Sequence, residues 1–216
     1  MNLVGIRMTS FDTSCRECKR LANFLDDVKA ENPDYFALPV PPFGAKKAKL
    51  LIVGLAPGMH GANRTGRPFT GDHAGILLYE TLYEFGFASK PESVSATDGL
   101  KLINCRITNA VKCLPPQNKP VGAEVNQCNK YLAEELEELP KGSVILALGC
   151  IAHNATLKAL GLKLSAFKFG HNELHKLENG KYLLDSYHCS RYNTQTKRLT
   201  TPMFKAVFRK AKKLID

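Results

Sequence analysis

The chain of 216 residues has the composition of an ordinary globular protein, with 44% hydrophobic and 23% charged residues, which predicts one domain over residues 1–216. No apolar run approaches the roughly 20 residues of a membrane helix, and residues 1–11 lack the pattern of an export signal, so we expect a soluble cytoplasmic protein with no membrane partner. Thirty Lys and Arg against twenty Asp and Glu leave a net charge of +10. This charge favours nucleic acid as the partner, although lysine that only aids solubility would give the same excess.

Helical and strand-like segments alternate along the chain. A helix is expected to begin near residues 15–18, and the proline-rich stretch at 39–42 is interpreted as an exposed connection after it. Apolar runs of strand length are found at 50–55, 107–111, 144–148 and 182–184, and stretches of helical character follow them at 74–85, 123–139, 150–160 and 202–214. This alternation predicts a three-layer α/β/α fold around a central, mainly parallel four-stranded sheet.

Unusual polar segments follow three of these strands, at 54–60, 109–113 and 188–193. In sheets of this kind, ligands bind beyond the carboxyl ends of the strands. The three segments are therefore expected to converge on one site.

Four of the cysteines have a spacing that suits a metal centre. Cys15 and Cys18 form a Cys-x-x-Cys pair, and Cys113 and Cys128 flank a proline-containing loop and the opening of the next helix. Four thiolates suit either zinc or a four-iron four-sulfur cluster, and the spacing alone does not choose between them. The competing interpretation is that Cys113 and Cys128 are small buried hydrophobic residues.

The other three cysteines are expected to have no chemical role. Cys105 and Cys150 border predicted apolar strands and are expected in the core, while Cys189 has no identifiable base that would activate it as a nucleophile. The odd total of seven in an intracellular chain also argues against a disulfide framework.

Four separated blocks cover most of the chain: Cys-Arg-Glu-Cys-Lys-Arg-Leu at 15–21, Gly-Leu-Ala-Pro-Gly-Met-His-Gly-Ala-Asn-Arg-Thr-Gly-Arg-Pro-Phe-Thr-Gly-Asp at 54–72, Thr-Asn-Ala-Val-Lys-Cys at 108–113, and Tyr-His-Cys-Ser-Arg-Tyr-Asn-Thr-Gln-Thr-Lys-Arg-Leu-Thr at 187–200. In this order they resemble the iron–sulfur uracil-DNA glycosylases of family 5, or type b. The resemblance implies a monofunctional glycosylase that hydrolyses the N-glycosidic bond of uracil in DNA. It also implies that the four paired cysteines hold a four-iron four-sulfur cluster. We expect a monomer that binds damaged or mispaired DNA at the nucleoid.

The resemblance assigns base recognition to two residues. The amide of Asn109 would donate to uracil O4 and accept from N3–H, a pattern opposite to that of cytosine, although an Asn at a strand end can also be a simple turn residue. Asn118 is a weaker second candidate for this role. Phe69 would stack on the base, with core packing as the alternative.

Two further residues would support the chemistry. His188 would donate to O2 of the departing base, where negative charge develops. Asp72 would orient water, because Leu55 and Ala56 occupy positions where many uracil glycosylases have a polar side chain. Asp72 also suits the N-cap of the following helix, and the two roles are compatible.

Further residues are expected to hold the base or the DNA backbone. Backbone N–H groups of Gly54, Ala56 and Gly58 would bind the base or a phosphate. The expected DNA-binding side chains are those of Arg64, Arg67, Ser190, Arg191, Asn193 and Arg198. Arg191 or Tyr192 would fill the space left by the flipped base. The chain departs from the family at Cys189, where proline commonly follows the histidine, and this predicts a looser loop.

Three alternatives stay open at this point. A non-catalytic iron–sulfur or zinc protein that binds nucleic acid would explain the charge and the cysteines, but not the Phe69 and Asn109 blocks. The sister family 4 shares the cysteine framework, but the segment around Ala56 argues against it. The resemblance to type b also leaves the base range open, with hypoxanthine and xanthine as further candidates.

Overall fold

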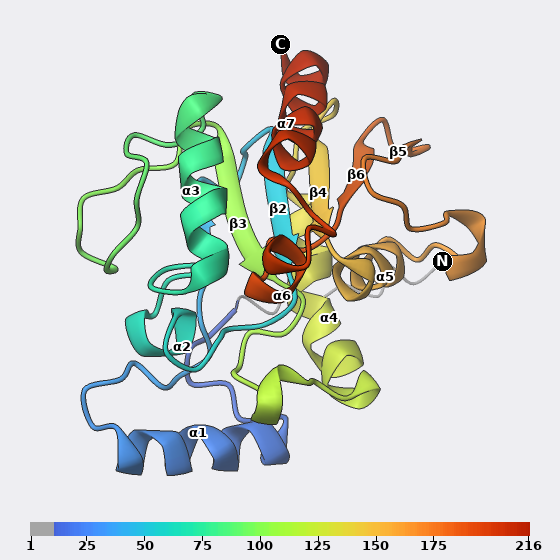
Figure 1. The fold of residues 1–216 in the computed structure, drawn as a ribbon. Coiled ribbons are helices and arrows are strands. Elements are labelled where there is room, and N and C mark those ends of the chain that lie inside the picture. The colour runs from blue at the N-terminus through green and yellow to red at the C-terminus, as the bar shows by residue number, and fades with distance from the viewer. Residues whose placement is uncertain (1–10) are drawn as a thin grey trace, which may run out of the picture.

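The computed structural model describes residues 11–216, which form a twisted sheet covered by helices on both faces (Figure 1). The prediction that the N-terminus carries no export signal falls, apart from Phe11, outside these residues. The sheet has six strands in the order β1-β3-β2-β4-β6-β5. Within residues 11–216, no helix has the length and apolar character needed to cross a membrane.

Four parallel strands form the centre of the sheet, and two short antiparallel strands form its edges. The parallel strands are fully buried along nearly their whole length, as expected for a sheet with helices on both faces. In chain order the strands are β1 Phe43–Gly44, β2 Leu50–Gly54, β3 Cys105–Asn109, β4 Val144–Leu148, β5 Leu174–Lys176 and β6 Tyr182–Ser186.

Two hydrophobic clusters cover the two faces of the sheet. One joins strand residues such as Ile52 and Leu146 to helices α3 and α7, which lie in front of the sheet in Figure 1. The other joins Leu51 and Ile145 to α4, α5 and the start of α1. The helices are α1 Lys19–Glu31, α2 Ala62–Thr65, α3 His73–Glu84, α4 Gly122–Glu137, α5 Cys150–Ala159, α6 Arg191–Gln195 and α7 Thr201–Ile215, with 3₁₀ turns η1 Pro116–Asn118 and η2 Leu164–Ala166.

The predicted α/β class and its four parallel strands are confirmed, with three differences in detail. The third strand is shifted toward the N-terminus relative to the predicted 107–111. The edge strands were not predicted, because segments of two or three residues are too short to show a period. The segment 39–42 is partly or fully buried instead of exposed, and the Val40 N–H donates to the Lys112 carbonyl over 2.7 Å.

The order of the strands fixes where a ligand site is expected. From β2 the chain crosses to β3 on one side and later to β4 on the other. The strand order therefore changes direction at β2, although the strands stay parallel. The loops that follow the strands on its two sides diverge from each other as a result. A crevice at the carboxyl ends of such strands is the usual position of a ligand site in open parallel sheets.

Candidate active site

A pocket of about 500 Å³ lies at this switch point, and four connections that follow parallel strands contribute to its wall. Apolar side chains provide most of the lining, with a few polar groups among them. The lining residues are Leu55, Ala56, Gly58, Ala62, Phe69, Asp72, His73, Ala74, Asn109, Asn118, Leu148, Gly149, Cys150, Ile151, His188, Ser190 and Arg191.

Asn109 is the last residue of β3, and its side chain is almost completely buried. Its Oδ1 has no hydrogen-bond partner among the described residues. Gly54, its register partner on β2, makes room for it: a Cβ on Gly54 would lie 2.3 Å from Asn109 Oδ1 and 2.7 Å from Phe69 Cζ. Because buried polar atoms are nearly always paired, the Asn109 amide is a polar group held ready for a ligand.

Phe69 is held beside Asn109 by an unusual backbone. Its φ of 56° lies in the left-handed region, which is uncommon for an aromatic residue. The hydroxyl of the buried Tyr79 donates to the Pro68 carbonyl over 2.8 Å, and a Cβ on Gly75 would lie 1.8 Å from the Phe69 carbonyl oxygen. Helix α3, which follows the loop, therefore holds the Phe69 backbone in place and so fixes the position of the aromatic ring.

His188 follows β6 and lies against the Phe69 ring. The ring centroids are 5.8 Å apart and the planes differ by 26°. The His188 Nδ1 is buried without a partner among the described residues, and burial lowers the pKa of this imidazole to about 4. His188 is therefore neutral near pH 7, and a neutral imidazole donates one N–H without adding a charge.

Asp72 both caps α3 and lines the pocket. Its Oδ1 accepts from the Gly75 N–H over 2.8 Å, so the predicted N-cap is present. Gly61 lies so close that a Cβ there would be 2.6 Å from Oδ2. Burial raises the pKa of this carboxyl and outweighs the opposing backbone hydrogen bonds. One carboxylate oxygen is thus fixed by the helix, and the other is directed toward the glycine-rich segment after β2.

Cys15, Cys18, Cys113 and Cys128 line a single small pocket between α1, α4 and the segment after β3. Cys18 is the N-cap of α1, so the Cys-x-x-Cys pair precedes the helix instead of starting it. The Lys112 N–H donates to Cys128 Sγ over 3.3 Å. The four predicted metal-binding residues are therefore brought together by the fold.

The environment of these sulfurs fits a group that carries positive charge. Burial, reinforced by the neighbouring thiols, raises the pKa of Cys18 to about 11 and also raises that of Cys113. The Tyr131 hydroxyl donates to Cys15 Sγ over 3.4 Å. Thiolates in such a place need a metal to be stable, and hydrogen bonds to sulfur are typical of the surroundings of metal-bound cysteine.

The family model described as the uracil DNA glycosylase superfamily matches residues 41–212. This chain belongs to the uracil DNA glycosylase superfamily. Among curated relatives, the Type-5 uracil-DNA glycosylase of Thermus thermophilus is 47% identical over 207 residues and covers 94% of each chain. The Type-5 enzyme of Pyrobaculum aerophilum is 43% identical over 202 residues, or 92% of this chain and 88% of the relative. A Type-4 enzyme of Archaeoglobus fulgidus is 31% identical over 166 residues, or 76% and 69%. The resemblance to family 5 is confirmed.

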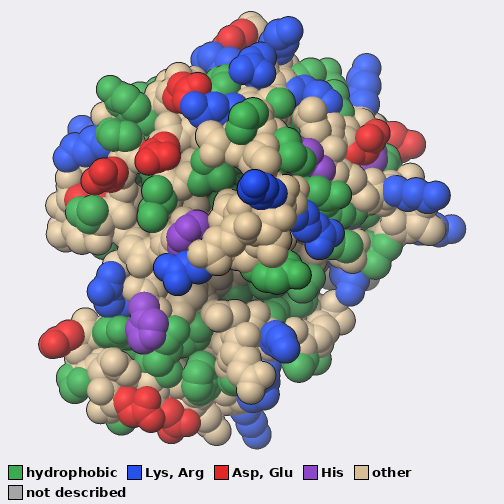
Figure 2. Space-filling view, viewed as in Figure 1, with side chains coloured by type: hydrophobic (Ala, Val, Ile, Leu, Met, Phe, Trp, Pro, Cys, Tyr) green, Lys and Arg blue, Asp and Glu red, His purple; other side chains and the backbone are tan. Residues whose placement is uncertain are grey.

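In this superfamily member, two of the predicted DNA-binding residues line the pocket: Ser190, which is the N-cap of α6, and the exposed Arg191. Arg64 and Arg198 are also exposed, and the Arg198 guanidinium lies 4.7 Å from the centre of the Tyr187 ring. Figure 2 shows that acidic side chains on this face lie toward its periphery, whereas the centre carries apolar, basic and histidine side chains. The surface around the pocket is therefore compatible with a polyanion.

The structure gives two predicted DNA-binding residues a different position. Arg67 is buried, and its guanidinium donates to Asp98 Oδ1 over 2.7 Å and to the Ala96 carbonyl over 2.6 Å. It holds the 93–98 loop and is not available to a phosphate, which corrects the prediction. Asn193 donates through Nδ2 to the His188 carbonyl over 2.8 Å. This side chain supports the His188 loop, and its contact with DNA stays a prediction.

Sequence reasoning missed the part of the pocket that follows β4. Gly149, Cys150 and Ile151 line the pocket at the beginning of α5. Cys150 is exposed, so its predicted place in the core is wrong. The signal available in the sequence was Gly149, a glycine at a strand-to-helix junction that adopts a φ of 99°.

Cys105 and Cys189 are buried in the cluster formed with α3 and α7. Burial raises the pKa of the Cys189 thiol and so disfavours its thiolate, the form that acts as a nucleophile. Two features oppose the expected loosening of the His188 loop: the buried side chain of Cys189 and the hydrogen bond from Asn193 to the His188 carbonyl. Asn118 has a φ of 57° and also lines the pocket.

Proposed function

We propose that this protein hydrolyses the N-glycosidic bond of uracil in DNA and leaves an abasic site, without a covalent intermediate on lysine. The observation that carries the proposal is the unpartnered Oδ1 of Asn109, buried beside Phe69 and Gly54 at the base of the pocket. A substrate base that is turned out of the helix must be recognised by its hydrogen-bonding edge and by stacking. Asn109 and Phe69 supply these two functions.

Asn109 distinguishes uracil from cytosine by the direction of its hydrogen bonds. Its Oδ1 accepts from N3–H of uracil and its Nδ2 donates to O4, whereas cytosine has an acceptor at N3 and a donor at N4. A cytosine in the same place would leave the buried Oδ1 facing the N3 acceptor and Nδ2 facing the N4 donor, so neither amide group would be paired. Such a mismatch costs roughly 1–3 kcal/mol for each unpaired group.

His188 stabilises the charge that develops on the departing base. When the bond between C1′ and N1 breaks, its electron pair moves into the ring and raises the negative charge on O2. A neutral imidazole N–H directed at O2 strengthens its hydrogen bond as this charge grows. The pKa of about 4 keeps the ring neutral, so it does not deliver a full proton to the base.

Asp72 orients the water that completes the reaction. The Asp72 carboxylate accepts a proton from a water molecule while the oxygen of that water bonds to C1′ of the oxocarbenium-like sugar. The negative charge of the carboxylate also offsets the positive charge on the sugar. The Gly75 N–H fixes the carboxylate in place. The apolar side chains of Leu55 and Ala56 provide no alternative base in the same segment.

A four-iron four-sulfur cluster held by Cys15, Cys18, Cys113 and Cys128 would have a structural role. Bound there, it would supply the charge that stabilises four thiolates and would tie α1 to the segment after β3. No group of three sulfurs among the described cysteines has all its members within 4.8 Å, whereas tetrahedral zinc with bonds of about 2.3 Å needs sulfurs roughly 3.8 Å apart. Together with the resemblance to family 5, this supports the cluster over zinc.

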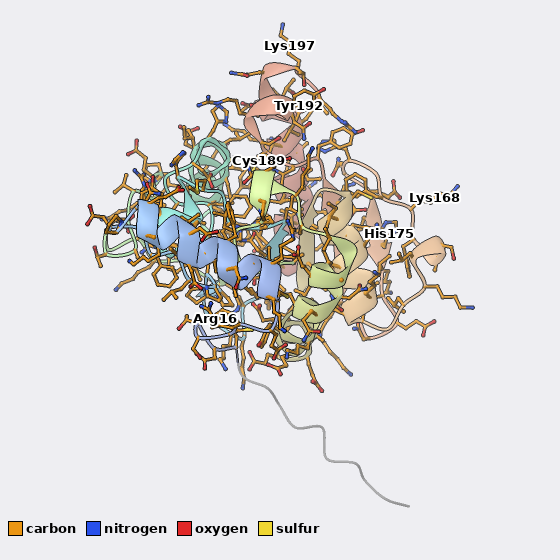
Figure 3. The ribbon with its side chains drawn as sticks, turned by 90° about the horizontal axis from the view of Figure 1, so that it is seen from below. Arg16, Lys168, His175, Cys189, Tyr192 and Lys197 are labelled. Carbon is orange, nitrogen blue, oxygen red and sulfur yellow. The ribbon has the colours of Figure 1, made fainter. Side chains whose placement is uncertain are left out.

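DNA binding is assigned to exposed groups around the pocket. Arg64, Arg191 and Arg198 would contact phosphates, and Tyr192, whose side chain is 71% exposed on α6, would enter the space left by the flipped base (Figure 3). We further propose that the protein acts as a monomer in the cytoplasm, on nucleoid DNA.

The test uses holoenzyme with its visible cluster absorption intact and a duplex that contains one deoxyuridine. Release of free uracil, together with an alkali-labile site in the strand, is the expected result. Binding of the duplex with no base release would instead favour the non-catalytic iron–sulfur or zinc protein. Asp72→Asn keeps the cap acceptor while weakening the base, and it should bind DNA normally but release uracil slowly.

We also propose that the enzyme accepts bases other than uracil. The composition of the pocket wall favours this second proposal. Beyond Asn109 and His188, the wall is mostly apolar and includes the small side chain of Ala56 and the half-exposed Ile151. An apolar wall rejects a larger base only weakly. A panel of duplexes with uracil, hypoxanthine, xanthine and mismatched thymine measures the range directly.

A further inference from the structure

A second cluster of metal-ligating side chains lies away from both the pocket and the four cysteines. His153 on α5, His175 on β5 and Asp185 on β6 have ligand atoms that all lie within 4.8 Å of one another. Asp185 is fully buried, His153 nearly so, and the His175 side chain is 12% exposed. In Figure 3, His175 lies beside the edge of the sheet, well apart from Tyr192.

The distances suit one metal ion between the three side chains. His153 Nδ1 lies 2.8 Å from Asp185 Oδ1, and His175 Nε2 lies 3.5 Å from Asp185 Oδ2. Bonds of about 2.0–2.2 Å from nitrogen and oxygen to a tetrahedral zinc ion place neighbouring ligand atoms roughly 3.3 Å apart. The two observed distances lie on either side of this value and run to the two oxygens of the same carboxylate, and all the ligand atoms lie within 4.8 Å of one another.

Hydrogen bonds from the surroundings orient two of the three groups, His153 and Asp185, as a metal site requires. The Phe167 carbonyl accepts from His153 Nε2 over 3.1 Å, which leaves Nδ1 as the coordinating nitrogen. The Gly170 N–H lies 3.4 Å from Asp185 Oδ2. Metal-bound histidines almost always donate their other ring N–H to a carbonyl or carboxylate in this way. The site thus has an outer shell as well as ligands.

One potential ligand atom of the cluster is buried and unpaired among the described residues. His175 Nε2 is buried and makes no hydrogen bond among the described residues. The rings of Phe167 and Phe169 pack against the two histidines, with centroids 5.3 and 5.7 Å away, so the wall is apolar. A buried carboxylate in such a wall needs a cation, which is either the His153 imidazolium or a metal ion.

We propose that His153, His175 and Asp185 bind one divalent transition-metal ion of the zinc class. Two imidazole nitrogens and one carboxylate group are a ligand set that zinc, cobalt and nickel all accept. Binding displaces the proton that His153 Nδ1 shares with Asp185 and releases it to solvent. The ion would join α5, which lines the pocket at its beginning, to the strand that leads to His188.

The experiment measures metal content of cluster-loaded protein after dialysis against micromolar zinc, for the wild type and two matched variants. His175→Gln removes a ligand on an edge strand, and His60→Gln removes an exposed imidazole elsewhere. Wild type and His60→Gln should retain one zinc per chain with the cluster absorption unchanged. His175→Gln should bind zinc more weakly by at least the roughly 10–100-fold that loss of an outer-shell partner costs.

Cobalt titration gives an independent readout of the ligands. A site made of nitrogen and oxygen gives d–d bands of bound cobalt without a thiolate-to-cobalt charge-transfer band. Equal zinc uptake by wild type and His175→Gln, loss of the bound zinc in His60→Gln, or a thiolate band with cobalt would each overturn the proposal. A failure of wild-type protein to retain any zinc would do the same.

Discussion

Because Gly54 lies close to Asn109 and Phe69, we predict that the change Gly54→Ala displaces the Asn109 amide and slows the reaction. The added Cβ would lie 2.3 Å from Asn109 Oδ1 and 2.7 Å from Phe69 Cζ. Non-bonded heavy atoms normally remain about 3.5 Å apart, so the Asn109 amide must move by about 1 Å. Neither neighbour can move freely, because Asn109 ends a buried strand and Phe69 is fixed from α3.

The expected magnitude follows from this displacement. A misplacement of about 1 Å in a positioned group costs roughly 100-fold in rate, or about 2.7 kcal/mol of transition-state stabilisation. Overpacking at a buried site costs a further 1–3 kcal/mol or so of folding free energy. The variant should therefore fold, keep the absorption of the proposed cluster and release uracil roughly 100 times more slowly.

Single-turnover release of uracil from a duplex, with denaturant unfolding in parallel, checks this prediction. Gly122→Ala is the matched control, because a Cβ at Gly122 meets nothing within 4 Å. This control should retain wild-type activity and equal or higher stability. Activity of Gly54→Ala within threefold of wild type would refute the idea that the glycine is needed to accommodate the amide.

Four further outcomes are expected. Asn109→Ala should lose about 10²–10³-fold in uracil release and less in hypoxanthine release, measured on matched duplexes, because the edges of the two bases differ. The pKa of His188 is about 4 in the folded protein and about 6.5 in the unfolded chain, so the unfolded state binds the proton first. Stability should thus fall as pH decreases from about 6.5 to 4, and His188→Gln should lack that part of the pH dependence in thermal unfolding. Arg67→Met leaves Asp98 buried without its cation and should cost about 3–5 kcal/mol in chemical denaturation. Arg64→Gln, at an exposed position, should instead weaken DNA binding and reduce its salt dependence, with stability unchanged.

Local signals predicted the parts of the site that depend on one segment at a time. Asn109 lies at the end of an apolar strand, Asp72 precedes a helix, and His188 follows the last parallel strand, so their common location at one edge of the sheet followed from the α/β alternation. The four cysteines were grouped by spacing and family resemblance, and the fold brings them into one pocket.

Features that depend on distant partners were not predictable from the sequence. In the sequence, Arg67 lies in a glycine-rich loop and resembles a surface cation. In the structure it is buried, because its guanidinium donates to Asp98, 31 residues later in the chain. Asp98 itself is held ionised: burial alone would raise its pKa, but Arg67 and three backbone N–H groups lower it well below the usual range. The His153 cluster also joins segments from one helix and two strands, and no motif marks it.

The two sides of the pocket differ in how much change they can accept. On the side of Gly54 and Gly75, any added carbon would collide with Asn109 or with the Phe69 backbone. On the side of Cys150 and Ile151, the side chains are exposed at the beginning of α5, and larger groups there have solvent to occupy. Directed evolution of new base preferences should therefore accumulate substitutions after β4 while the glycine side stays constant.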